Sequence, residues 1–154
     1  MKILFITESL DQQSGWGRYS SSLINSLKTS EIEVDVLCQK KYGRETFCQV
    51  SGLPPALNFR SNYIFFLFYG IKIIFSSLLK KPDVIHCVVE TYVPIAWVLS
   101  KYWDVPYVLT VHGSFGIKTM INRWCAWIQR MCYRHAQTII AVSQYTKKRL
   151  LEKV

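Results

Sequence analysis

Short apolar runs alternate with amphipathic segments along the whole chain, and this alternation limits the available folds more than any other feature of the sequence. A short continuous apolar run is typical of a strand buried on both faces, whereas apolar residues spaced three and four apart indicate a helix. Strands are predicted at residues 2–7, 33–38, 45–50, 83–88, 107–112 and 138–142. Helices are predicted from Arg18 onward, over 62–79, from Pro94 to about Trp103, over 120–135, and from Ser143 to the end.

This order of elements indicates the fold class. Strands that alternate with helices through short connections build parallel βαβ units. The sequence therefore predicts an α/β fold, a Rossmann-like doubly wound parallel sheet of about six strands in the order 3-2-1-4-5-6. The length of 154 residues fits one domain with a single core, and a hydrophobic share of 50% excludes a disordered chain.

Charge and cysteine content restrict the partners and the compartment. The formal net charge of +9 suits a polyanion, an anionic membrane surface or a phosphorylated ligand, and it does not choose among them. A nucleic-acid partner is not expected, because no nucleic-acid-binding motif accompanies the charge. The five cysteines form no C-x-x-C pair, which argues against a zinc knuckle and a disulfide framework. The first apolar run is too short for a signal peptide, so a cytoplasmic protein is expected.

Ligands of doubly wound sheets bind beyond the carboxyl ends of the strands, which directs attention to the loops after the first, fourth, fifth and sixth predicted strands. The first of these loops contains Ser14-Gly15-Trp16-Gly17-Arg18 and leads into the first helix. Glycines allow the backbone to approach a ligand, and a helix N-terminus offers N–H groups to an anion. The sequence thus predicts a phosphate-binding loop at Gly15 and Gly17, with Arg18 adding a positive charge. An ordinary turn is the alternative.

Spacing disfavours several other kinds of site. A dinucleotide site of the G-x-G-x-x-G type lacks its third glycine, since Ser20 stands at that position, and the second strand ends without an acid for the ribose. The sequence contains no P-loop Gly-Lys-Ser/Thr, no zinc-ligand spacing and no G-x-S-x-G nucleophile elbow. Neither a metal site nor a cofactor is predicted.

Polar residues mark the ends of the later strands. His112 ends the fifth predicted strand and precedes Gly113, and an imidazole at that place can contact a substrate or orient a hydroxyl. A structural histidine is the alternative. His86 and Glu90 flank the loop after the fourth strand, where a structural role is favoured. Ser143 opens the last helix; a plain N-cap is favoured there over a contact to an anion or sugar hydroxyl.

Residues 63–79 (YIFFLFYGIKIIFSSLL) form the most apolar segment and contain one charge, Lys72. A membrane-spanning helix needs about 20 apolar residues, so this segment is marginal for that purpose. Arg60, Lys80 and Lys81 flank the segment. We expect a domain helix with an exposed aromatic face that docks on an anionic membrane surface, and burial against the sheet or a partner protein is the alternative.

Taken in order, these segments resemble the amino-terminal half of the retaining, two-domain glycosyltransferases of family 4, which have the GT-B architecture. MKILFITESL and SGWGRYSSSLINSL are similar to the first strand, the glycine loop and the first helix of that family. EVDVLC, PDVIHCVVETYVPIA, VPYVLTVHGSF and AVSQYTKKRL are similar to the segments around its second, fourth, fifth and sixth strands. The resemblance covers nearly the whole chain.

The resemblance implies an enzyme that moves a sugar from a nucleotide-sugar to a glycan or lipid-linked acceptor, with the anomeric configuration retained and without a metal. His112 matches the active-site histidine of the family. Gly15 and Gly17 match the loop that approaches the donor phosphates and the acceptor, and Arg18 matches the basic residue after it. Further candidate contacts to the acceptor or sugar are His86, Glu90, Gly113 and Ser143.

The sequence departs from the family pattern at three places. Ser14 replaces the first glycine of the usual pair, and Glu31-Ile32 stands where a Gly-His pair usually precedes the second strand. The chain also stops at Val154, before the domain that holds the nucleotide-sugar. We therefore expect residues 1–154 to form an acceptor-side domain that is inactive without a donor-binding domain, in the cytoplasm or peripheral at the inner face of the membrane. The alternative is a non-catalytic binding or accessory protein that keeps the fold.

Overall fold

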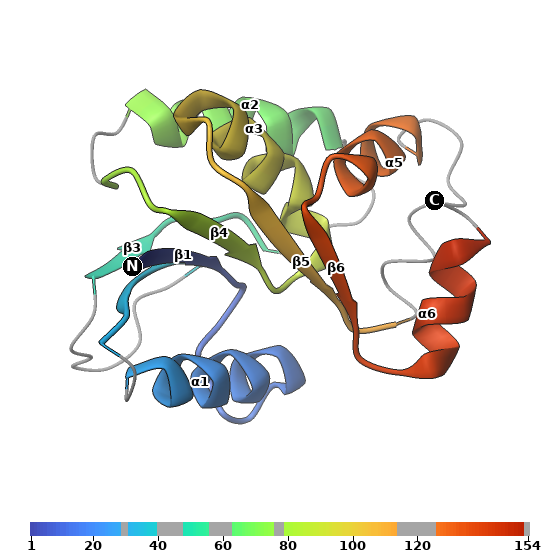
Figure 1. Ribbon diagram of the computed structural model, residues 1–154. Coiled ribbons are helices and arrows are strands. Elements are labelled where there is room, and N and C mark those ends of the chain that lie inside the picture. The colour runs from blue at the N-terminus through green and yellow to red at the C-terminus, as the bar shows by residue number, and fades with distance from the viewer. Residues whose placement is uncertain (29–30, 40–47, 56–62, 76–78, 114–125, 153–154) are drawn as a thin grey trace.

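The computed structural model describes residues 1–28, 31–39, 48–55, 63–75, 79–113 and 126–152 (Figure 1). Six strands form one sheet in the order β3-β2-β1-β4-β5-β6, and every neighbouring pair is parallel. This arrangement confirms the predicted α/β class and the predicted strand order. The chain crosses between the two halves of the sheet at β1 and β4, where a doubly wound fold has its topological switch point.

The observed strands follow the apolar runs of the sequence closely. They are β1 (Lys2–Ile6), β2 (Glu33–Cys38), β3 (Cys48–Ser51), β4 (Val84–Cys87), β5 (Tyr107–Val111) and β6 (Thr138–Ala141). β2 has the predicted bounds, and β1, β4, β5 and β6 are one or two residues shorter than predicted. Residues 45–47 of the predicted third strand lie outside the described residues.

The helices depart more from the prediction. They are α1 (Gly15–Lys28), α2 (Tyr63–Phe75), α3 (Val93–Trp103), α5 (Ala126–Arg134) and α6 (Gln144–Leu151), with a short 3-10 helix η1 (Glu90–Tyr92) before α3. α1 begins three residues before Arg18. Leu79 lies outside α2, so that helix is shorter than expected. Residues 120–125 of the predicted fifth helix are not among the described ones.

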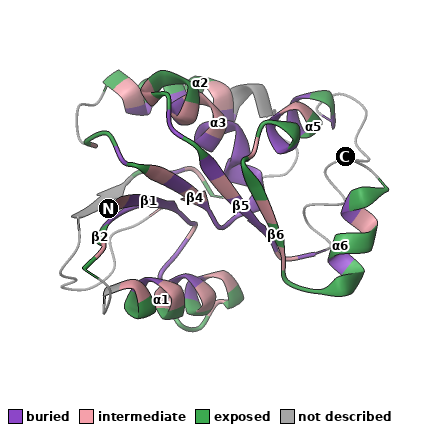
Figure 2. Cartoon of the chain, viewed as in Figure 1, coloured by how far each residue is buried: buried purple, intermediate pink, exposed green. Residues whose placement is uncertain are grey.

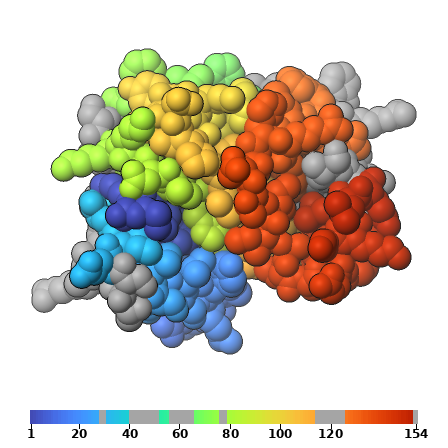
Figure 3. Space-filling model, viewed as in Figure 1, coloured from blue at the N-terminus to red at the C-terminus, as the bar shows by residue number. Residues whose placement is uncertain are grey.

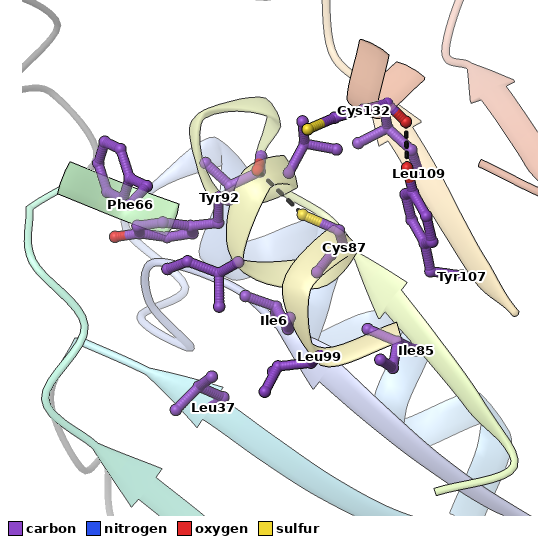
Figure 4. Packing of buried hydrophobic residues seen from close by; sticks show 14 of the residues in the cluster. Ile6, Leu37, Phe66, Ile85, Cys87, Tyr92, Leu99, Tyr107, Leu109 and Cys132 are labelled. Carbon is purple, nitrogen blue, oxygen red and sulfur yellow. Dashed lines mark hydrogen bonds between the residues drawn. The ribbon is translucent and has the colours of Figure 1, made fainter. Parts of the chain in front are cut away.

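Helices cover both faces of the sheet. α2, α3 and α5 lie on one face and α1 lies on the other (Figure 1). The larger core cluster joins β-strand residues to the first of these faces, and Ile6, Ile85, Leu99 and Leu109 are among its members (Figure 4). A smaller cluster lies under α1 and includes Phe5, Ile24 and Val36. Buried residues are concentrated in the central strands and in α3 (Figure 2).

Ionic contacts hold the amino edge of the sheet together. The Lys2 ammonium lies 2.9 Å from Glu33 and 2.8 Å from the buried carboxylate of Asp35, so it joins β1 to β2. The backbone N–H of Lys2 donates to Asp83 Oδ2, just before β4. These contacts join β1, β2 and the start of β4 at the amino edge of the sheet.

α2 presents one buried and one exposed face. Phe66 and Ile73 are buried, and Gly70 lets the helix approach α3 so closely that an added Cβ would lie 2.9 Å from Val98 Cβ. Phe68 and Phe75 are 66% and 81% exposed on the other side. The segment is thus a domain helix that packs on α3 and still exposes apolar side chains. Within the parts of the chain that the structure describes, no helix has the length and hydropathy needed to cross a bilayer.

Candidate functional site

Four loops meet at the carboxyl edge of the sheet. The Tyr19 ring, in the second turn of α1, meets the His112 ring edge-on at a centroid distance of 4.8 Å. Glu90, from the segment after β4, accepts a hydrogen bond from the backbone N–H of His112. A Cβ on Gly113 would lie 3.5 Å from Thr146 Oγ1 at the start of α6. The segments after β1, β4, β5 and β6 therefore converge at one edge, as the strand order predicts.

Ser14 determines where α1 begins. Its hydroxyl accepts a hydrogen bond from Gly17 N–H at 2.9 Å, and its carbonyl accepts from Arg18 N–H at 2.9 Å. These are the bonds of an N-cap residue, which explains why the helix starts earlier than predicted. The serine that replaces a glycine of the family pattern thus orders the helix N-terminus, the part of α1 that faces the ligand edge.

The two loop glycines have different surroundings. A Cβ at Gly17 would overlap the Asp11 carbonyl oxygen and lie 2.7 Å from Ser14 Oγ, so the loop packs against this position. A Cβ at Gly15 would meet no described atom within 4 Å beyond its chain neighbours and the backbone of its own helix. Gly17 is therefore required by the fold of the loop, whereas the space beside Gly15 is open for a ligand.

Hydrogen bonds hold the loop between β1 and α1 in shape. Asp11 N–H donates to Ser9 Oγ at 2.8 Å, and Ser21 Oγ donates to the Leu10 carbonyl at 2.8 Å. The buried hydroxyls of Thr7 and Ser20 lie 2.8 Å apart, at the position where a dinucleotide site would carry its third glycine. The loop is consequently preorganised for a ligand, which reduces the entropy lost on binding.

His112 is half-buried just beyond β5, and one nitrogen of its ring lacks a hydrogen-bond partner among the described residues. Burial lowers the pKa of His112, and a hydrogen bond to the backbone of Val88 opposes this effect. Nε2 is buried and has no hydrogen-bond partner among the described residues. A ring nitrogen without a protein partner is available for a hydrogen bond with a substrate hydroxyl.

Glu90 is hydrogen-bonded to the backbone of this histidine and is 1% exposed. Its Oε1 accepts from His112 N–H at 2.6 Å, and its Oε2 has no partner in the described parts of the chain. Burial raises the pKa of the Glu90 carboxyl, while the N–H groups of His112 and Gly113 act in the opposite direction. Glu90 is thus a buried acid that is hydrogen-bonded to the backbone of the segment that carries His112.

His86 lies within the strand that was predicted at residues 83–88. It lies inside β4, where Nε2 is 2.8 Å from Thr110 Oγ1 of the neighbouring strand and the ring centroid is 5.0 Å from that of Phe5. Burial lowers the pKa of His86 to about 4, and the nearby His112 contributes to this shift. The contacts favour the structural role for this residue.

His86 makes the stability of the fold depend on pH. Its pKa is about 4 in the folded chain, against 6.5 for an ordinary histidine. The stabilisation is therefore complete above pH 6.5 and is lost as the pH falls toward 4, because the unfolded chain binds the proton first. We expect the free energy of unfolding to fall by about 2–3 kcal/mol across this window. Denaturant unfolding of the wild type and of His86→Gln, which keeps a donor to Thr110, measures the difference.

The titration of Glu90 changes the free energy of unfolding in the opposite direction over part of the same pH range. Its raised pKa stabilises the fold below pH 4.5 and loses that effect as the pH rises through the folded value. Because Glu90 is present in both proteins, its contribution cancels when the wild type is compared with His86→Gln. Equal pH dependence in the two proteins would contradict the assignment to His86.

Ser143 is the N-cap of α6. Its hydroxyl accepts from Thr146 N–H at 3.1 Å and lies 2.9 Å from Thr146 Oγ1. Gly113, with a φ of +119°, forms the turn opposite this cap. The Arg18 side chain is exposed, and its Nε donates to the Gln12 carbonyl at 3.4 Å. Of the residues predicted for the site, Gly15, Glu90, His112, Gly113 and Ser143 thus lie on the converging segments.

Three contributors were not predicted as site residues. Tyr19 lies on the first predicted helix, and its ring contacts His112. Ser14 was treated only as a lost glycine, and Thr146 was treated as part of the last helix. A serine directly before the first residue of a helical pattern is the signal of an N-cap. This signal identifies Ser14 and Ser143 alike. No sequence signal pairs Tyr19 with His112, because the two are 93 positions apart.

Comparisons with known proteins agree with this geometry. The sequence profile of Glycosyltransferase Family 4 matches residues 13–154. No curated protein sequence matches the chain. Among solved structures, the apo form of the lipopolysaccharide outer core galactosyltransferase WaaB is similar, with 16% identity and a TM-score of 0.61 over 99% of this chain and 42% of that one.

Two further structures share the fold. Sucrose-phosphate synthase from Thermosynechococcus elongatus has 15% identity and a TM-score of 0.65, with 99% of this chain and 45% of that chain covered. The S. aureus MnaA–UDP structure has 12% identity and a TM-score of 0.58, with 98% and 41% covered. The chain spans less than half the length of each of these structures, as one Rossmann-like half of a GT-B fold does. By its sequence profile and its fold, this chain belongs to glycosyltransferase family 4 and forms an amino-terminal domain of that family.

Proposed function

We propose that the chain is the acceptor-side half of a retaining glycosyltransferase, which moves a sugar from a nucleotide-sugar to a hydroxyl of a glycan or a lipid-linked acceptor. The observation that carries this proposal is the buried Nε2 of His112, which lacks a partner among the described residues and stands at the edge where the loops converge. Family membership supplies the reaction class. The proposal invokes no metal ion and no cofactor.

The residues of the edge have separate roles in this proposal. His112 accepts a hydrogen bond from a hydroxyl of the transferred sugar and so orients the ring. The open space beside Gly15 and the N-terminus of α1 lie toward the donor phosphates, where backbone N–H groups stabilise negative charge as the leaving group departs. Arg18 adds positive charge on the same side, and Gly113 and Ser143 border the acceptor.

The donor nucleotide is held by a second domain in this proposal. The similarity of the chain to less than half of each compared structure supports that division. The test is transfer of radiolabelled sugar from a panel of UDP-, GDP- and ADP-sugars. Residues 1–154 alone should give no transfer, and the protein that joins them to a donor-binding domain should give it. Turnover by residues 1–154 alone, or none by the joined protein, would contradict the proposal and favour a binding or accessory role.

The exposed face of α2 is the proposed contact with a membrane that carries the acceptor. Phe68, Ile71 and Phe75 are all exposed, and their spacing of three and four places them on one side of the helix. The exposed lysines Lys72, Lys80 and Lys81 lie on or just after α2. α2 and α3 lie side by side at the upper surface of the molecule (Figure 3). Apolar side chains with flanking cations fit the interface of an anionic bilayer, and such a protein would be peripheral at the cytoplasmic side.

Vesicle binding tests this surface. Phe75→Ser should lower the partition coefficient for anionic vesicles roughly tenfold, because burial of one aromatic side chain contributes about 1.5 kcal/mol or more. Trp127→Ser is the matched control, since Trp127 is 62% exposed on α5 and should not affect binding. High salt should weaken binding, because each lysine near the surface adds about 1 kcal/mol. Equal co-sedimentation of Phe75→Ser and the wild type would contradict a membrane role for this face.

A further inference from the structure

We propose that Glu90 is a positioning residue for His112: it binds the backbone at the end of β5 and thereby fixes the orientation of the imidazole that contacts the substrate. The inference rests on the proposed function for the role of His112, and it adds a residue that acts through that histidine rather than on the sugar. Glu90 belongs to η1, whose three residues are all buried between β4 and α3.

The hydrogen bonds of Glu90 connect two loops of the site. Its Oε1 accepts from His112 N–H at 2.6 Å, a short distance that is typical of a charge-assisted bond. Gly113 N–H also interacts favourably with the carboxylate. The carboxylate therefore holds the backbone at the point where the chain leaves β5 and turns through the positive φ of Gly113. Movement of that turn would move the Cα of His112 and with it the ring.

The His112 ring is restrained from the other sides by neighbours of fixed position. Its edge-on contact with Tyr19 and its bond to Val88 leave Nε2 as the remaining polar atom. These contacts act on the ring, and Glu90 acts on the backbone that carries it. Together they define both the position and the tautomer of the imidazole.

Burial separates this role from a direct contact with sugar. Glu90 is 1% exposed, and its Oε2 is enclosed by protein atoms, so a ligand above the loop does not reach it. Among the described residues, no lysine or arginine forms an ion pair with this carboxylate, whereas the buried Asp35 has Lys2. A buried acid without a cation costs stability, which its hydrogen bond from His112 N–H offsets only in part. This cost is consistent with a role in the site rather than in the core.

The test combines three variants with two readouts in the intact protein. Glu90→Ala removes the acceptor, Glu90→Gln keeps an oxygen for His112 N–H, and Asp35→Asn is the control for loss of a buried carboxylate at the opposite edge. The first readout is the tautomer of His112 from imidazole ¹⁵N shifts at pH 7.5. The second is kcat and KM for nucleotide-sugar in the transfer assay.

We expect Glu90→Ala to produce a mixture of His112 tautomers and to lower kcat roughly 10²-fold with little change in KM, as misplacement of a catalytic group does. Glu90→Gln should restore the single tautomer and most of kcat, and Asp35→Asn should leave both readouts unchanged. An unchanged tautomer and kcat in Glu90→Ala would overturn the proposal, as would a raised KM with normal kcat, which would make Glu90 a substrate contact.

Two features keep the test decisive. If Glu90→Ala fails to fold, Glu90→Met replaces it, because methionine fills the space without offering an oxygen acceptor: faster amide exchange at His112 and Gly113 than in Asp35→Asn supports the proposal, and equal exchange overturns it. If the wild-type protein transfers no sugar, the proposed function fails, whereas the tautomer readout still reports whether Glu90 positions the ring.

Discussion

Replacement of His112 by alanine is expected to lower kcat for sugar transfer roughly 10²-fold or more, within the usual range for a positioned proton-transfer or hydrogen-bonding group. The reason is the arrangement of the ring: Nε2 is buried without a partner among the described residues and is available to a substrate hydroxyl. The free energy of unfolding should change little, because the ring is only half-buried at the end of a strand. Steady-state kinetics on the intact protein, with denaturant unfolding alongside, measure both quantities.

His135 provides the matched control for this substitution. It is exposed after α5, and its Nδ1 is 2.8 Å from the Met131 carbonyl, away from the converging loops. His135→Ala should leave kcat unchanged. If His112→Ala retains normal kcat while folding correctly, His112 is a structural histidine, and the proposed role of the carboxyl edge loses its main support.

The second large effect is expected at Gly17. A methyl group there would overlap the Asp11 carbonyl, and because this contact is with backbone, no rotation of a side chain relieves it. Gly17→Ala should therefore lower the free energy of unfolding by about 3 kcal/mol or force the β1–α1 loop into another conformation. Chemical denaturation and amide shifts of residues 8–18 measure these two outcomes.

Gly15→Ala separates the requirements of the fold from those of the ligand. In the described part of the chain, a Cβ at this position meets no atom within 4 Å beyond its chain neighbours and its own helix backbone, and alanine is the better residue inside a helix. Stability should therefore stay within about 1 kcal/mol of the wild type. Transfer should nevertheless fall roughly tenfold, because the methyl group occupies space that the proposal reserves for the donor. Equal loss of stability in both glycine variants would contradict the different surroundings of the two positions.

Much of the fold could be predicted from the sequence, because burial on both faces produces the same pattern in each strand. The run at residues 33–38 became β2 with the same bounds, and the alternation of strands and helices led to the observed strand order. The loops that meet at the carboxyl edge followed from that order alone. Parallel topology thus brings Gly15 and His112 to one edge without any knowledge of side-chain contacts.

One detail that the sequence analysis missed has a local cause, and the others depend on contacts between distant residues. The start of α1 depends on the hydroxyl of Ser14, and the sequence analysis took that residue for a lost glycine. The His86 ring contacts Thr110 of the neighbouring strand, and no pattern in the sequence pairs these two side chains. The link from Glu90 to His112 joins positions 22 apart through a backbone N–H group, which carries no residue-specific pattern. Register and side-chain direction, rather than composition, decide these features.

The central claim is that nucleotide-sugar binds at the carboxyl edge between Gly15 and His112. Amide chemical-shift mapping of the intact, ¹⁵N-labelled protein during titration with UDP-, GDP- and ADP-sugars tests it most directly. The account predicts that the largest shifts occur at Gly15, Gly17, His112 and Gly113, with little change at Lys2 and Asp83 on the amino edge. Shifts confined to the amino edge, or to the exposed face of α2, would contradict it.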